Sequence, residues 1–243
     1  MTLTYAIGDI HGQRGMLEDM LASIDRDNDC NGTGDAQIVF LGDYVDRGPD
    51  SAGVLDLLAQ GLGEGRNWVL LKGNHDRMME WFLEPESRHD PHLLVGYHWL
   101  HDRIGGLTTL ASYGVDAGER RRLSDVSAEA RDGVPQAHMD LLRGLQLSHR
   151  QPGRFFCHAG VRPGVPLDDQ VENDLLWIRQ EFLIDPLDHG ALIVHGHTPV
   201  DTPDLHRNRL NLDTGAGYGR PLGAAVFDGG DVFAINAMGR VKL

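Results

Sequence analysis

Carboxylate, amide and imidazole side chains stand at short glycine-containing turns, each of which follows an apolar run. In chain order they are Asp9, His11, Asp43, Asn74, His75, His158 and His197. Oxygen and imidazole ligands in this mixture suit hard to borderline divalent metal ions. Glycines beside these residues let the backbone turn sharply, so that the ligands approach a single point. The pattern therefore predicts a metal-dependent site.

The number of ligands implies more than one metal ion. Six ligand side chains remain when His75 is set aside, more than one catalytic metal needs if it keeps a position open for water or substrate. The carboxylate of Asp43 is suited to bridging two ions. Two metals about 3.5–4 Å apart hold a phosphoryl group and generate a hydroxide between them. We expect two divalent ions, manganese first, with iron or zinc as alternatives that ligand type does not separate.

Three further residues fit the other tasks of phosphoryl transfer. The transition state spreads negative charge over the equatorial oxygens, and Arg47 follows Asp43 on the same turn, where it is placed to offset that charge. His75 is the histidine that the metals do not require. Held by a carboxylate such as Asp46, its imidazole would act as general acid for the leaving oxygen.

Alternating strands and helices in the first third of the chain place these turns. Apolar runs predict strands at 3–8, 37–41 and 67–71. Helical spacing of apolar residues marks 14–24, and further helices are expected from Pro49 and near Asn74. A β-α-β-α-β order is typical of parallel strands, whose carboxyl ends meet at the edge where ligands bind. The charged turns are therefore expected to converge.

The rest of the chain continues the sheets around a helical segment. We interpret residues 76–150 as a helical insertion that covers the site, and not as a separate domain. Strands at 154–157 and 191–194 lead into His158 and His197. Strand-like runs at 209–213, 223–227 and 231–237 suggest antiparallel pairing in a second sheet packed on the first. The expected fold is α/β, with a single domain spanning 1–243.

Five sequence blocks also carry a family resemblance. GDIHG, GDYVDRG, GNHD, HAG and HGHTP, in this order, resemble the phosphoprotein phosphatase branch of the calcineurin-like metallophosphoesterases. The resemblance implies a β-sandwich of two mixed sheets flanked by helices. It also implies that Asp9, His11 and Asp43 bind the first metal, and that Asp43, Asn74, His158 and His197 bind the second. His75 with Asp46 resembles the family's acid pair, and Arg47 resembles an arginine that grips phosphate.

One more arginine comes from the resemblance alone. In LLWIRQEF, Arg179 follows a Trp-x-Arg pattern that resembles a second phosphate-binding arginine of the bacterial and phage members. His195 lies two residues before His197, and strand alternation puts both on one face. We expect His195 to be a structural histidine, because the family pattern needs only the histidine before Thr198.

These observations favour a two-metal phosphomonoesterase for phosphoserine and phosphothreonine, with phosphotyrosine left open. In this hypothesis a metal-bridging hydroxide attacks phosphorus directly. Bacterial diadenosine tetraphosphatases of the symmetric type are also similar, but they typically carry Ala-Arg where this chain has Asp46-Arg47. That difference makes hydrolysis of dinucleoside polyphosphates the alternative. A non-catalytic phosphate-binding module is a third hypothesis; it predicts loss of a ligand or of the acid pair, and neither is lost.

Composition limits the partners. A net charge of −14 argues against a general nucleic-acid binder, which would need a basic face. No apolar run approaches the roughly 20 residues that span a bilayer, and the first residues lack the pattern of a signal peptide. Two cysteines give no disulfide framework, so we expect a cytoplasmic protein. Its partner would be a phosphorylated protein or a small phosphoester; the oligomeric state stays open.

Overall fold

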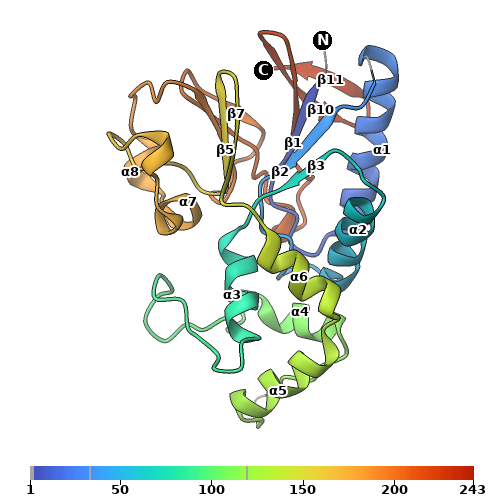
Figure 1. The fold of residues 1–243 in the computed structure, drawn as a ribbon, viewed down its shortest axis with the longest axis vertical. Coiled ribbons are helices and arrows are strands. Elements are labelled where there is room, and N and C mark those ends of the chain that lie inside the picture. The colour runs from blue at the N-terminus through green and yellow to red at the C-terminus, as the bar shows by residue number, and fades with distance from the viewer. Residues whose placement is uncertain (1–2, 33, 119) are drawn as a thin grey trace.

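Two mixed β-sheets stacked face to face form the frame of the protein, with helices on both outer faces (Figure 1). The computed structural model describes residues 3–32, 34–118 and 120–243. The first sheet has the strand order β11-β10-β9-β1-β2-β3. Its strands are β1 (Thr4–Ile7), β2 (Gln37–Phe40), β3 (Trp68–Leu70), β9 (Ala224–Asp228), β10 (Asp231–Asn236) and β11 (Gly239–Lys242).

The second sheet has the order β4-β5-β6-β8-β7. Its strands are β4 (Ser148–Gln151), β5 (Arg154–Cys157), β6 (Leu192–His195), β7 (Asp204–Leu205) and β8 (Arg209–Asn211). β1, β2 and β3 are parallel to one another, as are β5, β6 and β8, while the outer strands pair antiparallel. The expected sandwich of two mixed sheets flanked by helices is therefore confirmed.

The expectation for the C-terminal strands was only partly correct. β8 lies in the second sheet, but β9 pairs with β1 and so extends the first sheet together with β10 and β11. Alternating apolar residues identify a strand, whereas its partner strand is set by packing between distant segments. The sequence pattern therefore located these strands without fixing the sheet to which they belong.

Side-chain alternation along β1 explains why the sheets stack. Tyr5 and Ile7 point to the outer face of the first sheet and pack in the core beneath the helices, whereas Ala6 points between the sheets. The interlayer core includes Phe156 and Val194 of the second sheet. On the outer faces lie α1 (Arg14–Asn31) and α2 (Ser51–Gly63) over the first sheet, and α7 (Glu172–Trp177) and α8 (Gln180–Leu183) over the second.

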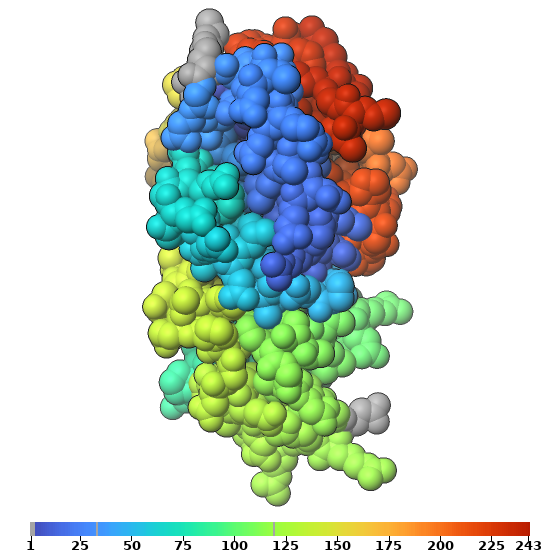
Figure 2. Space-filling view, turned by 90° about the vertical axis from the view of Figure 1, so that its right-hand side faces the viewer, coloured from blue at the N-terminus to red at the C-terminus, as the bar shows by residue number. Residues whose placement is uncertain are grey.

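The remaining helices gather at one end of the sandwich. They are α3 (Asn74–Phe82), α4 (Gly106–Ser112), α5 (Leu123–Gly133) and α6 (Gln136–Gly144), and they form the lower part of the molecule in Figures 1 and 2. β4 begins at Ser148, so the helical part of the 76–150 range ends at Gly144. Among the described residues, none of the helices combines the length and the apolar character needed to cross a bilayer.

Candidate metal centre

The predicted ligand residues meet where the carboxyl ends of strands from both sheets face each other. Asp9 and His11 follow β1, Asp43 follows β2, and Asn74 follows β3. His158 and His197 follow β5 and β6 of the second sheet. Two hydrogen bonds join the sheets here: His158 Nδ1 donates to the carbonyl of Leu41 at 2.9 Å, and the His197 N–H donates to the carboxylate of Asp9 at 3.1 Å.

A buried carboxylate that sequence reasoning missed ties the turns together. Asp76 accepts the backbone N–H groups of Asp43, Tyr44 and Gly73 at 2.8–2.9 Å. Burial and the charge of Asp43 raise the pKa of Asp76 to about 8, against the effect of these three donors. A Cβ on Gly42 would lie 2.5 Å from Gly73 N, so glycine is needed for the close approach of the two turns.

The backbone is strained at the ligand positions. Within 3–32, 34–118 and 120–243, the non-glycine residues with positive φ are His11, Asp43, Asp46, Arg47 and His197, at 47–74°. Such left-handed conformations cost L-residues energy and persist where surrounding structure holds them, often at functional sites. All five residues belong to the predicted site, which supports a functional reason for the strain.

One group of ligand atoms forms around Asp43, His158 and His197, whose candidate ligand atoms all lie within 4.8 Å of one another. His158 Nε2 is 3.5 Å from Asp43 Oδ1 and 2.9 Å from Asn74 Oδ1. The structure thus brings together the four residues that the sequence assigned to one metal.

A second group combines His11, Asp43 and His75 within the same limit. His11 Nε2 lies 3.5 Å from Asp43 Oδ2, so Asp43 is shared by both groups, as a bridging ligand would be. Asp9 belongs to neither group, and its carboxylate instead accepts the N–H of His197.

The donor atoms fit divalent cations. His11 Nδ1 donates to the carbonyl of Val45 at 2.8 Å, and His158 Nδ1 donates to that of Leu41, so each Nε2 presents a lone pair to the site. His197 Nδ1 lies 3.2 Å from His158 Nε2, so a nitrogen of each ring faces the cluster. Two imidazole nitrogens that converge with the Asp43 carboxylate are suited to binding a divalent cation.

Electrostatics also favour a cation. Burial, together with the charges of Asp213 and Asp43, raises the pKa of Asp9 well above its ordinary value. Burial lowers the pKa values of His11 and His197, so these imidazoles are neutral and do not offset the carboxylates. Metal ions would supply the missing positive charge, which favours the ionised carboxylates and leaves neutral imidazoles free to bind.

The predicted acid pair is in hydrogen-bonding contact. His75 Nδ1 donates to Asp46 Oδ2 at 2.5 Å, which leaves His75 Nε2 facing the site. Asp46 is fully buried and accepts two further donors, Trp99 Nε1 and Thr109 Oγ1. Sequence reasoning did not single out Trp99 or Thr109, which lie 53 and 63 residues beyond Asp46.

Of the two predicted arginines, Arg47 contacts the cluster directly. Arg47 Nη1 contacts His11 Nε2, and Arg47 Nη2 is 3.0 Å from His75 Nε2. The guanidinium therefore offers positive charge between the two imidazoles. Loss of hydration lowers the pKa of Arg179, while the charge of Asp43 opposes this effect, so Arg179 is close enough to sense the cluster.

Among the buried side chains, His195 and Cys157 stand outside the ligand groups. His195 is fully buried, packs against Phe182 with ring centroids 5.0 Å apart, and faces the carbonyl of Gly196. Cys157 is a buried free thiol whose pKa is raised by burial. A buried thiol with a raised pKa is a poor nucleophile.

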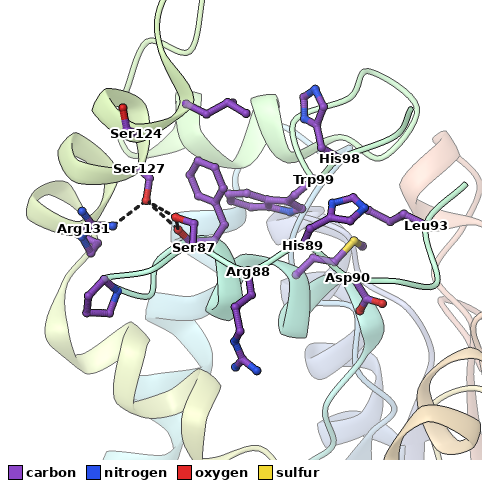
Figure 3. Close-up of a pocket in the computed structure, with 14 residues that line it drawn as sticks. Ser87, Arg88, His89, Asp90, Leu93, His98, Trp99, Ser124, Ser127 and Arg131 are labelled. Carbon is purple, nitrogen blue, oxygen red and sulfur yellow. Dashed lines mark hydrogen bonds between the residues drawn. The ribbon is translucent and has the colours of Figure 1, made fainter. Parts of the chain in front are cut away.

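A cavity of about 410 Å³ lies within the helical end (Figure 3). Its lining includes Trp99, Phe82, Leu93, Arg88 and Arg131, and it contains none of the predicted metal ligands. Trp99 packs on Phe82, with ring centroids 4.9 Å apart. The indole that holds Asp46 is therefore also a wall of this cavity.

Comparison with known proteins places this site in context. The family model described as calcineurin-like phosphoesterase matches residues 3–226. The bis(5'-nucleosyl)-tetraphosphatase PrpE (asymmetrical) of Oceanobacillus iheyensis is 28% identical over 242 residues, covering 91% of this chain and 87% of that protein. The PrpE protein of Anoxybacillus flavithermus is 27% identical over 230 residues, covering 90% and 87%.

Solved structures share the fold. A crystal structure of a protein proposed to be a diadenosine tetraphosphatase has a TM-score of 0.64 and 23% identity, covering 96% of this chain and 92% of the other. A cold-active protein-tyrosine phosphatase of a psychrophilic Shewanella has a TM-score of 0.61 and 15% identity, covering 100% and 80%. At these identities the likeness concerns the fold alone.

The comparisons correct the expected substrate. The curated relatives that match nearly the whole chain are named bis(5'-nucleosyl)-tetraphosphatases, so the phosphoprotein phosphatase hypothesis is wrong. That hypothesis depended on Asp46-Arg47. In the structure Asp46 bonds to His75, Trp99 and Thr109, and Arg47 contacts imidazoles of the cluster. Asp46 and Arg47 therefore contact side chains that would act at the phosphorus atom of any substrate. Neither residue distinguishes the organic groups that different phosphoesters carry.

Proposed function

This chain belongs to the calcineurin-like phosphoesterase family, and from that premise we propose that it hydrolyses dinucleoside tetraphosphates with two divalent metal ions. The observation that carries the proposal is the shared carboxylate of Asp43 between two ligand groups, beside the His75–Asp46 pair. The full-length similarity to asymmetrical tetraphosphatases supports the choice of substrate. We infer asymmetric cleavage, which yields a nucleoside monophosphate and a nucleoside triphosphate.

The proposed ligands are the six residues Asp9, His11, Asp43, Asn74, His158 and His197. Divalent ions bound by them would act as Lewis acids on the phosphoryl oxygens and lower the pKa of an attacking water. Manganese is the first metal to test, because imidazole and carboxylate ligands accept several divalent ions. The bond that forms joins the water oxygen to the α-phosphorus next to one nucleoside, and the bond that breaks joins this phosphorus to the oxygen that bridges it to the β-phosphorus.

The protein's own side chains would handle charge and protons. Arg47 and Arg179 would bind the equatorial oxygens, where negative charge develops. Asp46 fixes the His75 ring by accepting the proton of Nδ1. A proton on His75 Nε2 would then pass to the oxygen of the departing nucleoside triphosphate.

We further infer that the chain forms one domain and that the helical insertion takes part in the site. The carbonyl of Gly105 accepts the N–H of Arg47 at 3.3 Å, and a Cβ on Gly105 would lie 2.5 Å from Arg47 N. Thr109 and Trp99, which hold Asp46, also come from this segment. The insertion would thus support the acid and one arginine.

Product analysis in ¹⁸O-labelled water tests the proposal. We expect Mn²⁺-loaded protein to convert diadenosine tetraphosphate into AMP and ATP, with the label in AMP. A phosphothreonine peptide at equal concentration serves as the competing substrate, and Asp43→Asn serves as the blank. Two ADP products would overturn the asymmetric assignment. Faster release of phosphate from the peptide than cleavage of the dinucleotide would overturn the proposed substrate.

A further inference from the structure

An exposed tyrosine stands at the mouth of the metal centre. Tyr218 ends the short 3-10 helix η2 (Ala216–Tyr218), between Gly215 and Gly219, which both adopt positive φ. Its side chain is 62% exposed. Such exposure is unusual for a large ring beside a buried polar cluster, and none of the roles proposed above uses this ring.

The turn that carries Tyr218 is pressed against the site. A Cβ on Gly217 would lie 2.7 Å from His11 Cδ2 and 3.0 Å from Arg47 Cδ, so a larger residue there would push the turn outward. The absence of a side chain at Gly217 is what lets the following ring reach the cluster.

One face of the ring already has a partner. The Arg47 guanidinium carbon lies 4.9 Å from the centroid of the Tyr218 ring, a cation–π contact. The same guanidinium contacts His11 and His75. Phosphate held by Arg47 would therefore run alongside an aromatic surface.

We propose that Tyr218 is a specificity-determining residue on which a nucleobase of the substrate stacks, while Arg47 beneath it binds phosphate. The inference rests on the proposed function. Every nucleobase has a π-face that stacks on an aromatic side chain, and the contact contributes measurably to binding. A phosphopeptide or a simple phosphoester would leave the exposed face of Tyr218 in water. The ring would thus favour nucleotides over other phosphoesters that suit the same metal chemistry.

A pair of inhibitors isolates the contribution of the base. AMP and ribose 5-phosphate share the phosphate and the ribose, so the ratio of their inhibition constants reports the base alone. We would measure both against hydrolysis of para-nitrophenyl phosphate by the Mn²⁺-loaded protein. We expect AMP to bind on the order of tenfold more tightly than ribose 5-phosphate.

Two variants of Tyr218 distinguish stacking of the base from a role in holding Arg47 in position. Tyr218→Leu, which keeps bulk but lacks a π-face, should bring the ratio close to one, and Tyr218→Phe should preserve it. If Tyr218 merely holds Arg47 in place, Tyr218→Leu weakens both inhibitors equally and the ratio stays unchanged, which would overturn the inference. A ratio near one in the unaltered protein would overturn it as well. Failure to cleave diadenosine tetraphosphate, with an intact ratio, would instead refute the proposed function.

Discussion

The indole N–H of Trp99 donates to both carboxylate oxygens of Asp46, at 3.0 and 2.9 Å. Asp46 in turn holds His75, so a tryptophan of the helical end fixes the orientation of the proposed general acid. Because Asp46 is completely buried, each donor that it loses leaves its charge less well compensated.

Replacing Trp99 should therefore impair the acid without removing the metals. We expect Trp99→Phe to lower kcat by roughly tenfold or more, since a hydrogen bond to a charged group is worth about 1.5–3 kcal/mol. KM for the dinucleotide should change little. Steady-state kinetics would measure both, with Trp81→Phe as the matched control, because Trp81 stacks on Arg77 and Arg88 instead. Equal losses in the two variants would mean that Trp99 acts through general stability.

Removing the acid itself should reveal its role through the leaving group. We expect His75→Asn to lower kcat by about 10²–10⁴, the usual contribution of a positioned acid. The loss should be larger for phenyl phosphate than for para-nitrophenyl phosphate, because the poorer leaving group needs the proton more. Rates on both esters, with bound Mn²⁺ determined in parallel, would test this. An equal loss on the two esters would remove proton donation from the role of His75.

Metal binding should depend on Asp43 more than on any other single ligand. Its two oxygens face both ligand groups, so Asp43→Asn should weaken both metals. Each Mn²⁺ ion at 100 times its Kd should stabilise the unaltered protein by about 2.7 kcal/mol and so raise its Tm, and the rise in Tm should largely disappear in the variant. Asp29→Asn, an exposed acid on α1, is the control. A full Mn²⁺-dependent rise in Asp43→Asn would contradict the shared-ligand arrangement.

An ion pair far from the metals should make stability depend on acidic pH. Asp27 accepts Arg240 Nε and Nη2 at 2.7 and 2.8 Å, and Tyr5 Oη at 2.6 Å. Burial opposes ionisation, yet these donors lower the pKa of Asp27 below its ordinary value. A carboxylate with a lowered folded-state pKa stabilises the fold above its unfolded pKa of about 3.9, and this stabilisation is lost as pH falls through the folded-state pKa.

Urea unfolding of Asp27→Asn at two pH values would check this. At pH 7 we expect the variant to be less stable by about 2 kcal/mol, the size of hydrogen bonds to a buried charge. The deficit should shrink steadily below pH 4, because the unaltered carboxyl then becomes protonated too. Asp25→Asn, on the same helix but exposed, should show no such trend. A deficit independent of pH would show that Asp27 acts through packing.

The sequence predicted those parts of the site that are set by local order along the chain. The predicted ligands follow the carboxyl ends of strands, so apolar runs and glycine turns were enough to place residues such as Asp43 and His158 at one edge. Contacts between segments far apart in the sequence could not be predicted from such local patterns. Nothing in the sequence near Asp46 indicates that Trp99 or Thr109 binds it. The substrate was misjudged for a related reason, because Asp46-Arg47 serves chemistry that several phosphoesters share.

Tyr218 is another residue whose proposed role could not be predicted from the sequence. No sequence pattern pointed to Tyr218, because its exposure and its contact with Arg47 depend on how the η2 turn packs against the site. Positive φ at His11 and His197 could not be predicted either, because most histidines adopt negative φ and the local sequence does not mark the exceptions.

Because the metal ligands come from both sheets, their spacing depends on how the two sheets are positioned relative to each other. Asp43 belongs to one layer and His158 to the other, and the contact between the layers is made by apolar side chains such as Phe156 and Leu41. A slide of one layer over the other by about 1 Å would separate groups that must meet at phosphorus, and misplacement of that size costs on the order of 100-fold in rate. The turnover rate of this protein would therefore depend on how its two sheets are aligned. A substitution among the apolar side chains between the sheets would change that rate without contacting a metal ligand.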